Sequence, residues 1–373
     1  MIRLMHVIPT LVKGGAEKQL CLLATHLPKD QFDVQVSVLT HTGLYEPWLT
    51  DDGISVVQIN KRWKLDPGAL WRLRKAIREF APDILQTWMF AANVYGRLAA
   101  MMESVPVIVA GERCADHWKV GYEHALDKYL ARRTERIVVN SAAVRDFYTN
   151  KQRLGADKFT IIPNGIDAAA AKGAGESREQ LASEIGIPTR APWIGVVARL
   201  WPQKRLKDVI WAADLLKVAE HQCHVLLFGD GPLRWRLERY AKQVNVADRV
   251  HFLGHREDVA QWLPHLRCLW LASQYEGQSN AIMEAMAAGV PVVASDIPAN
   301  RTLIDHGETG LLYPVGDRGD LARQTHRLLS DDQLADRLGR AGRERIQNEF
   351  GVEKMVRSYA QLYEELVEGE RDD

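Results

Sequence analysis

Short apolar segments rich in β-branched residues alternate with amphipathic segments along the whole chain, and this alternation restricts the fold more than any other feature. Several of the short segments are apolar throughout, as strands are when helices cover both faces of their sheet. The pattern therefore predicts an α/β protein with parallel sheets. Strands are expected at residues 3–8, 33–39, 54–59, 84–86, 105–110, 136–140 and 160–162, and again at 193–199, 223–228, 249–253, 268–272, 291–294 and 310–313.

The alternation lapses once, over residues 168–192, where an alanine- and glycine-rich stretch and two prolines indicate a connection between domains. A chain of 373 residues is also too long for one ordinary core. We therefore predict two Rossmann-like domains, residues 1–170 and 186–351. Ligands of open parallel sheets bind beyond the carboxyl ends of the strands, so two such sheets would face a central cleft. The last predicted helix, 352–366, has an apolar face that either domain could bury.

The charge balance argues against one class of partner. The chain has 48 basic and 48 acidic residues, and a nucleic-acid-binding protein normally has a basic excess. Residues 2–9 lack the basic start and long apolar core of a secretory signal, and the apolar runs are shorter than the roughly 20 residues of a membrane span. We expect a cytoplasmic protein that does not bind nucleic acid.

The segment 273–295, SQYEGQSNAIMEAMAAGVPVVAS, carries the strongest chemical signal. A predicted strand leads into a loop with Glu276, Gly277 and Ser279, and a helix with Glu284 follows. Free backbone amides at the start of such a helix suit a diphosphate, and Gly277 allows a close approach. The two carboxylates could accept hydrogen bonds from sugar and ribose hydroxyls. The plainer alternative is a helix cap, formed by Ser273 with Glu276, and a solvated Glu284.

The segment 193–205, WIGVVARLWPQKR, places cations at the end of another strand. The strand is expected to end at Arg199, and a turn containing proline brings Lys204 to the start of the next helix. Arg can bind two phosphate oxygens as a fork and Lys supplies a point charge, so the pair suits a diphosphate.

Glycines follow two other predicted strands. Gly14 and Gly15 come after the first strand, but GGAEKQ lacks the GxGxxG pattern of a dinucleotide-binding turn, which argues against a nicotinamide-dependent oxidoreductase. Gly229 begins the turn GDGP at the end of a strand in the second half.

A metal site is not expected, because no pair of carboxylates stands at a strand end and no histidines share a helix face. Arg199 and Lys204 could neutralise the phosphate charge instead.

Residues 61–78, KRWKLDPGALWRLRKAIR, combine seven basic side chains with Trp63 and Trp71. The segment could contact an anionic membrane surface, at the inner face of the membrane. It could equally be a basic helix face with both tryptophans in the core.

Taken together, these motifs make the sequence similar to the family 4 retaining glycosyltransferases of the GT-B fold. The resemblance rests on Glu276 and Glu284 within EGQSNAIMEAMAAGVPVVAS, and on the order of the motifs GGAEKQ, PNGID, VARLWPQKR and GDGP before it. It spans nearly the whole chain. It implies that the last helix crosses back to the N-terminal domain, which makes residues 352–373 part of that acceptor-binding domain and leaves 186–351 as the donor-binding domain.

The resemblance also implies roles for individual residues. Arg199 and Lys204 would hold the pyrophosphate, Glu276 would contact the transferred sugar, and Glu284 would bind the ribose. Backbone groups of the donor site would come from Gly15, Gly229, Gly277, Gln278, Ser279 and Asn280. Many members have a histidine after a central strand of the first domain, where this chain has AGERCADHWK. The acceptor-side candidates there are Glu112, Arg113, Asp116 and His117.

The resulting hypothesis is a retaining glycosyltransferase that moves a sugar from a UDP- or GDP-linked donor to a glycan, lipid-linked or small-molecule acceptor. The nucleotide sugar is a substrate, and neither a cofactor nor a metal ion is expected. A nucleotide-sugar epimerase of the same fold and a non-catalytic nucleotide-sugar binding protein are the alternatives.

Overall fold

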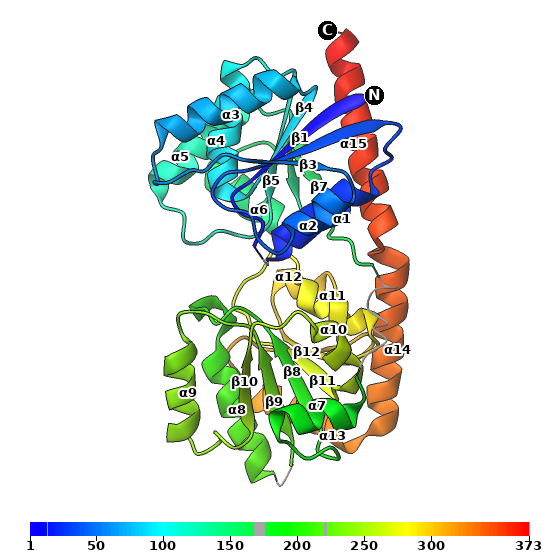
Figure 1. Ribbon diagram of the computed structural model, residues 1–373. Coiled ribbons are helices and arrows are strands. Elements are labelled where there is room, and N and C mark those ends of the chain that lie inside the picture. Colours follow the sequence, from blue (N-terminus) through cyan, green and yellow to red (C-terminus); the bar gives the residue numbers. More distant parts are fainter. Residues whose placement is uncertain (13, 168–175, 220–221, 373) are drawn as a thin grey trace. The chain divides into compact units, whose positions relative to one another are not determined.

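The computed structural model describes residues 1–12, 14–167, 176–219 and 222–372 (Figure 1). The chain divides into two compact units, the first formed by Met1–Gly165 with Val352–Asp373 and the second by Ile166–Gly351. Of the predicted connection 168–192, residues 168–175 lie outside the described residues, and α7 (Arg178–Ile185) forms part of the remainder.

The first unit is built on a seven-stranded sheet in the order β3-β2-β1-β4-β5-β6-β7, and its recorded strand pairs are parallel. The strands are β1 (Ile2–Ile8), β2 (Phe32–Val38), β3 (Ser55–Gln58), β4 (Ile84–Trp88), β5 (Val107–Glu112), β6 (Arg136–Val139) and β7 (Phe159–Ile161). The helices are α1 (Gly15–His26), α2 (Glu46–Asp51), α3 (Pro67–Phe80), α4 (Met89–Met102), α5 (Gly121–Leu130), α6 (Ala142–Gln152) and α15 (Val352–Asp372).

The second unit has a six-stranded parallel sheet in the order β10-β9-β8-β11-β12-β13. Its strands are β8 (Trp193–Val197), β9 (His224–Phe228), β10 (Val250–Gly254), β11 (Cys268–Leu271), β12 (Val292–Ser295) and β13 (Leu311–Tyr313). Besides α7, its helices are α8 (Leu206–Val218), α9 (Arg234–Gln243), α10 (Val259–Trp262), α11 (Asn280–Ala287), α12 (Pro298–Arg301), α13 (Arg318–Ser330) and α14 (Asp332–Glu349). The prediction of two α/β units with parallel sheets is confirmed.

Apolar cores on both faces of each sheet explain why most positions of the central strands are apolar. In β1, Leu4 and Ile8 pack into one core, whereas Met5 and Val7 pack into another. Because successive side chains of a strand point to opposite faces, this division places one core on each side of the sheet. The residues of β9 are divided between two cores in the same way.

The C-terminal helix α15 belongs to the core of the first unit. Met355, Tyr359, Leu362 and Tyr363 lie on one helix face and are buried among residues of β1, β4 and α1. The Tyr363 hydroxyl donates a hydrogen bond to the side-chain oxygen of Gln86 on β4. The helix is therefore held both by apolar burial and by a buried polar contact.

Among the strand ends that differ from the predicted ones, two concern predicted site residues. The strand predicted over 105–110 continues to Glu112, because Glu112 is paired in register with Val139 of the neighbouring strand. The strand expected to end at Arg199 ends at Val197, which leaves Arg199 in the following loop.

The suggestion that Trp63 and Trp71 lie in the core is wrong. In α3 the buried positions are Ala69, Leu73, Ala76, Ile77 and Phe80, which form a single helix face. Trp71 is outside that face and is exposed, as is Trp63 in the loop before the helix.

None of the helices in the described part of the chain combines the length and the hydropathy that crossing a bilayer requires.

Candidate active site

The second sheet changes direction between β8 and β11, and most of the predicted donor-site residues follow these two strands. From β8 the chain continues to β9 and β10 on one side, whereas β11, β12 and β13 lie on the other side. Loops that leave neighbouring strands in opposite directions open a crevice at the carboxyl edge of the sheet, where ligands of such folds bind. Arg199 and Lys204 come after β8, and Glu276 comes after β11.

Lys204 and Glu276 meet across this switch point. The ammonium group of Lys204 donates a hydrogen bond to Oε1 of Glu276 and forms an ion pair with it. The two side chains are 16% and 10% exposed, so the pair is shielded but can still be reached from solvent. Within this shielded setting each charge stabilises the other more than it would at an open surface.

Backbone contacts hold the two loops in place. A short 3₁₀ turn, Pro202–Lys204, ends at the lysine, and the backbone N–H of Lys204 donates to Trp201 over 3.0 Å. The N–H of Gln274, in the loop after β11, donates to the carbonyl of Gln203 over 2.8 Å. The meeting of Lys204 with Glu276 is therefore built into the backbone of both loops.

Arg199 lies on the same edge of the sheet and is exposed. Its guanidinium carbon is 5.1 Å from the ring centre of Trp201, which limits the directions that the side chain can take. The predicted cation pair is thus placed beside one strand end, but only Lys204 contacts a predicted carboxylate directly.

The loop after β11 ends at a well-formed helix start. Ser279 is the N-cap of α11, and its side chain accepts a hydrogen bond from the N–H of Ile282 over 3.4 Å. The alternative cap formed by Ser273 and Glu276 is wrong, because α11 begins at Asn280, seven residues after the buried Ser273. Glu276 is therefore available to Lys204.

The remaining donor-site candidates of this segment surround the helix start. Gly277, Gln278 and Ser279 are buried, Asn280 is half-buried as the first residue of α11, and Glu284 is half-buried one turn later. The first turn of a helix presents backbone N–H groups that lack partners within the helix.

Gly229 has a structural role at the same edge. Its φ of 134° is in the region that favours glycine, and an added Cβ would lie 2.1 Å from the carbonyl oxygen of Ala198. The strand-end loops of β8 and β9 are joined here, since the N–H of Leu200 donates to Asp230 over 3.0 Å. Gly229 therefore allows the approach that positions the loop of Arg199, and its contact with a donor stays a prediction.

Gly15 lies at the corresponding point of the first sheet, which changes direction between β1 and β4. It is the first residue of α1, and the N-cap residue Gly14 has no side chain that could satisfy the helix amides. Gly15 thus lies at the edge of the sheet where the phosphate contact is predicted, and its contact with a donor stays a prediction.

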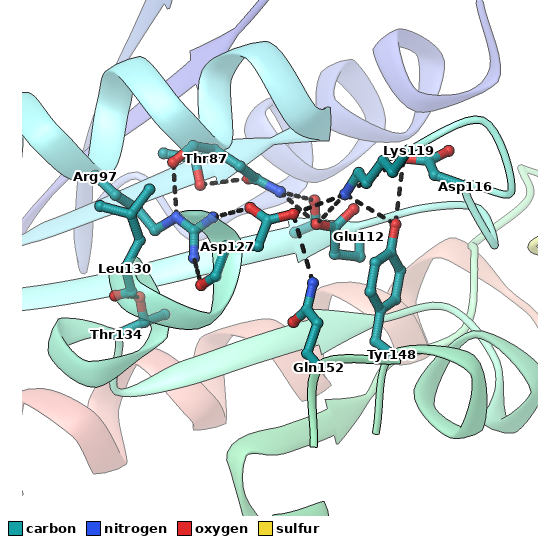
Figure 2. Close-up of polar contacts among 12 residues, drawn as sticks. Thr87, Arg97, Glu112, Asp116, Lys119, Asp127, Leu130, Thr134, Tyr148 and Gln152 are labelled. Atoms are coloured by element: carbon teal, nitrogen blue, oxygen red, sulfur yellow. Dashed lines mark hydrogen bonds and ion pairs between the residues drawn. The ribbon is translucent and has the colours of Figure 1, made fainter. Parts of the chain in front are cut away.

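Two of the four acceptor-side candidates, Glu112 and Asp116, belong to a polar network in the first unit, and Figure 2 shows its buried centre. Lys119 is completely buried; its ammonium group is 3.0 Å from Glu112, 3.0 Å from Asp127 and 3.5 Å from Asp116. Tyr148 accepts a hydrogen bond from Lys119 and donates one to Asp116. Glu112 and Asp116 are therefore held in place by neighbouring charges.

Sequence reasoning did not find Lys119, Asp127 or Arg97, which complete this network. Arg97 is buried in α4 and pairs with Asp127. Buried Arg and Lys side chains each require a partner of opposite charge. The sequence signal that could have indicated such partners is the pattern of charged residues in the helices. The pairing itself joins residues that are far apart in the sequence.

Burial governs the pKa values of the network. Loss of hydration raises the pKa of Glu112 to about 7, even though Lys119 favours its ionised form. The same burial opposes the charge of Lys119, but attraction by Glu112, Asp127 and Asp116 exceeds it and raises the pKa of Lys119. The lysine therefore stays charged, and Glu112 titrates near neutral pH.

Arg113 and His117 have different surroundings. Arg113 donates to the side-chain oxygen of Asn164 and, over 3.2 Å, to the hydroxyl of Tyr359 in α15. His117 is exposed, and its ring packs at 4.7 Å against Phe147. Arg113 thus connects the end of β5 with the C-terminal helix, whereas His117 is the candidate that solvent reaches most easily.

Throughout the part of the chain that the structure describes, no three His, Cys, Asp or Glu side chains are grouped closely enough to bind a metal ion.

Comparison with known families gives two matches that together span most of the chain. The model described as Glycosyltransferase Family 4 matches residues 13–170, and the model described as Glycosyl transferases group 1 matches residues 177–345. The chain is similar to N-acetyl-alpha-D-glucosaminyl L-malate synthase of Bacillus anthracis, with 34% identity over 194 residues; this match covers 52% of the chain and 50% of that protein.

Two further proteins match over almost their whole length. The UDP-Gal:alpha-D-GlcNAc-diphosphoundecaprenol alpha-1,3-galactosyltransferase of Escherichia coli is 25% identical over 386 residues, which covers 98% of the chain and 97% of that protein. The crystal structure of Anabaena HepE in complex with UDP-glucose superposes with a TM-score of 0.86 at 21% identity, covering 98% of the chain and 100% of HepE. This second likeness shows that the fold is shared.

We expect the free energy of unfolding of a Glu112→Gln variant to depend less on pH than that of the wild type. The pKa of Glu112 is about 7 in the folded chain, whereas an ordinary glutamate titrates near 4.5. Between these values the folded state retains a proton that the unfolded state has released, so the free energy of unfolding of the wild type falls as the pH rises. Urea unfolding from about pH 4 to about pH 8 measures this slope.

The exposed Glu79 on α3 provides the control for this measurement. Glu79→Gln should leave the slope of the wild type unchanged, and Glu112→Gln should make it shallower. A Glu112→Gln slope equal to that of the wild type would show that folding does not raise the pKa of Glu112.

Proposed function

The chain belongs to the family 4 glycosyltransferases of the GT-B fold, and we propose that it transfers a sugar from a nucleoside diphosphate sugar to an acceptor, with retention of anomeric configuration and without a metal ion. The first unit binds the acceptor and the second unit binds the donor in this proposal.

The ion pair between Lys204 and Glu276 is the observation that carries the proposal. The bond that breaks in a nucleotide sugar joins the anomeric carbon to an oxygen of the diphosphate. A cation for the phosphate and a carboxylate for the sugar must therefore stand next to each other. Lys204 and Glu276 do so at the switch point of the second sheet. When a donor binds, Lys204 would turn to the phosphate and leave Glu276 to accept from sugar hydroxyls.

The charge of the leaving nucleoside diphosphate is stabilised by Arg199 and Lys204. Both cations follow the end of β8, and Lys204 is held there by Glu276. Positive groups that are already oriented stabilise most strongly the charge that develops in the transition state. Arg199 can bind two phosphate oxygens at once, and Lys204 supplies a compact charge at the bridging oxygen. The two cations perform the neutralisation that a divalent ion performs in metal-dependent transferases.

The start of α11 completes the donor site. Backbone N–H groups from Gly277 to Asn280 would donate to the diphosphate and the sugar, and Glu284 in the second turn would accept from the ribose hydroxyls. Gly15 would add backbone donors from the first unit, and Gly229 would approach the donor at the end of β9.

The reaction is a displacement on one face of the sugar. The bond between the anomeric carbon and the phosphate oxygen breaks, and a bond to the acceptor oxygen forms on the same face. The proton of the acceptor hydroxyl passes to the leaving phosphate, which departs as part of the nucleoside diphosphate. Glu276 orients the sugar and does not form a covalent intermediate.

The donor is UDP- or GDP-linked in this proposal. A uridine nucleotide is supported by the name of the Escherichia coli relative and by the UDP-glucose bound to HepE. The acceptor is a glycan, a lipid-linked sugar or a small molecule. Buried Glu112 and half-buried Asp116 position the acceptor-side loop in this scheme, and exposed His117 is the group most able to meet the acceptor.

Slow hydrolysis of the donor tests the reaction without knowledge of the acceptor, because water can take the acceptor's place. With UDP-glucose and EDTA we expect release of UDP, and proton NMR should detect α-glucose before it equilibrates with the β-anomer. The same experiment with GDP-mannose tests the other donor class.

Other outcomes of this experiment separate the alternatives. Release of β-glucose first would contradict retention, and activity that requires added Mg²⁺ would contradict metal independence. A changed sugar on an intact nucleotide would indicate an epimerase, and binding without turnover a non-catalytic protein.

A Lys204→Met variant should lower kcat/KM for donor hydrolysis by about 100-fold to about 1000-fold, because the leaving phosphate loses a fixed cation. Lys207→Met is the matched control, since Lys207 is exposed on α8 only three residues further along the chain. Steady-state kinetics of both variants, with circular dichroism to verify folding, should show a loss for Lys204→Met alone. Equal kinetic constants for the two variants would remove Lys204 from the mechanism.

A further inference from the structure

We infer that the first unit docks on an anionic lipid surface through the lipid-facing surface, defined as Trp63, Leu65, Trp71, Trp118, Val120 and Tyr122. This goes beyond the proposed transfer reaction, since it concerns where the chain resides and not which bond it breaks.

Three large apolar side chains in and beside α3 are exposed to solvent, although side chains of this kind are usually buried in a core. Trp63 is 65% exposed, Leu65 is 84% exposed and Trp71 is 58% exposed. Single exposed apolar residues are common on protein surfaces, whereas a concentration of three large ones within nine residues favours an interaction site. Because the buried face of α3 is complete without Trp71, packing within the unit does not require this residue to be tryptophan.

A second segment, distant in the sequence, extends this patch. Trp118, Val120 and Tyr122 are 55%, 50% and 61% exposed. The ammonium group of Lys64, between Trp63 and Leu65, donates to the hydroxyl of Tyr122 over 3.1 Å. The helices that follow the two segments, α3 and α5, both pack on α4, as Figure 1 shows. The fold thus joins two aromatic segments into one surface.

Positive charge accompanies the aromatic side chains, and the nearby acids are buried. Lys61, Arg62 and Lys64 lie in the loop that carries Trp63 and Leu65. Asp66 is 4% exposed, and its side chain caps α3 by accepting from the N–H of Ala69. Tryptophan and tyrosine favour the boundary between lipid and water, and neighbouring cations favour anionic head groups. The charge and the side chains therefore fit a lipid surface better than an apolar protein groove.

A hollow of 340 Å³ beside this loop supplies a place for a head-group phosphate. It is lined by Thr40, Asn60, Lys61, Arg62 and Arg72, next to the carboxyl ends of β2 and β3. Arg72 is fixed at the hollow because its guanidinium donates to the carbonyl of Ile59 over 2.6 Å and to that of Asn60 over 2.9 Å. Three cations at one concave site match the charge and the acceptor oxygens of a lipid phosphate.

Co-sedimentation of the full chain with vesicles tests the inference. Vesicles of phosphatidylcholine containing phosphatidylglycerol should bind the protein at low ionic strength, and vesicles of phosphatidylcholine alone should bind it about 10-fold less. A Trp63→Ser/Trp71→Ser variant and a Lys61→Gln/Arg62→Gln variant should each lower binding to the anionic vesicles by about 10-fold.

A matched control comes from the second unit, where Trp235 and Arg236 are also exposed next to each other on α9. A Trp235→Ser/Arg236→Gln variant should bind the vesicles as the wild type does. Donor hydrolysis without vesicles, measured on the same samples, should be equal in all variants, so that a failure of docking is distinguished from a failure of the proposed function.

Three results would overturn the inference. The first is equal binding of the wild type to both kinds of vesicle. The second is protection of the wild type by inorganic phosphate in a thermal shift without any vesicle binding, which would indicate a site for free phosphate. The third is a wild-type dimer in gel filtration that the Trp63→Ser/Trp71→Ser variant dissociates, without vesicle binding, which would indicate that a second copy of the chain covers the surface.

Discussion

The meeting of Lys204 with Glu276 depends on a property of parallel sheets: the carboxyl ends of neighbouring strands lie at one edge. In the second unit β8 and β11 are neighbours although Ile194 and its partner in the register, Cys268, are 74 positions apart in the sequence, and the chain leaves the two strands in opposite directions. Loops from distant parts of the sequence thereby deliver a cation and a carboxylate to one place. The contact from Gln274 to Gln203 fixes both loops, so the pair is preformed and its position does not depend on long side chains finding each other.

In the first unit the structural requirement is different, because several charged side chains are buried together. The ammonium group of Lys119 contacts three carboxylates, and the guanidinium group of Arg97 forms an ion pair with one of these, Asp127. Removing one member of such a network leaves the others without compensation, which is far more costly than loss of a surface pair. The network holds the loop from Glu112 to Lys119, and it therefore links the stability of this unit to the geometry of its proposed acceptor side.

The architecture, and the placement of Lys204 and Glu276 at neighbouring strand ends, could be predicted from the sequence for identifiable physical reasons. Strands buried on both faces are apolar without interruption, so both sheets could be predicted, and motifs at strand ends pointed to Lys204 and Glu276. The ion pairs of Lys119 and Arg97 could not be predicted, because they depend on three-dimensional contacts between β5, α4, α5 and the loop that carries Lys119. The exposure of Trp71 also could not be predicted: the helical period of α3 is compatible with either a wider or a narrower apolar face, and tryptophan suits both a core and an interface.

Calorimetric titration with UDP and with GDP tests most directly whether the loops of the β8–β11 switch point hold a nucleoside diphosphate. The account predicts that the wild type binds at least one of these nucleotides, and that an Arg199→Met/Lys204→Met variant binds it about 100-fold more weakly, because two charge-assisted contacts to the phosphates are lost. Equal affinity of the wild type and this variant would contradict the account, since the diphosphate would then be bound elsewhere.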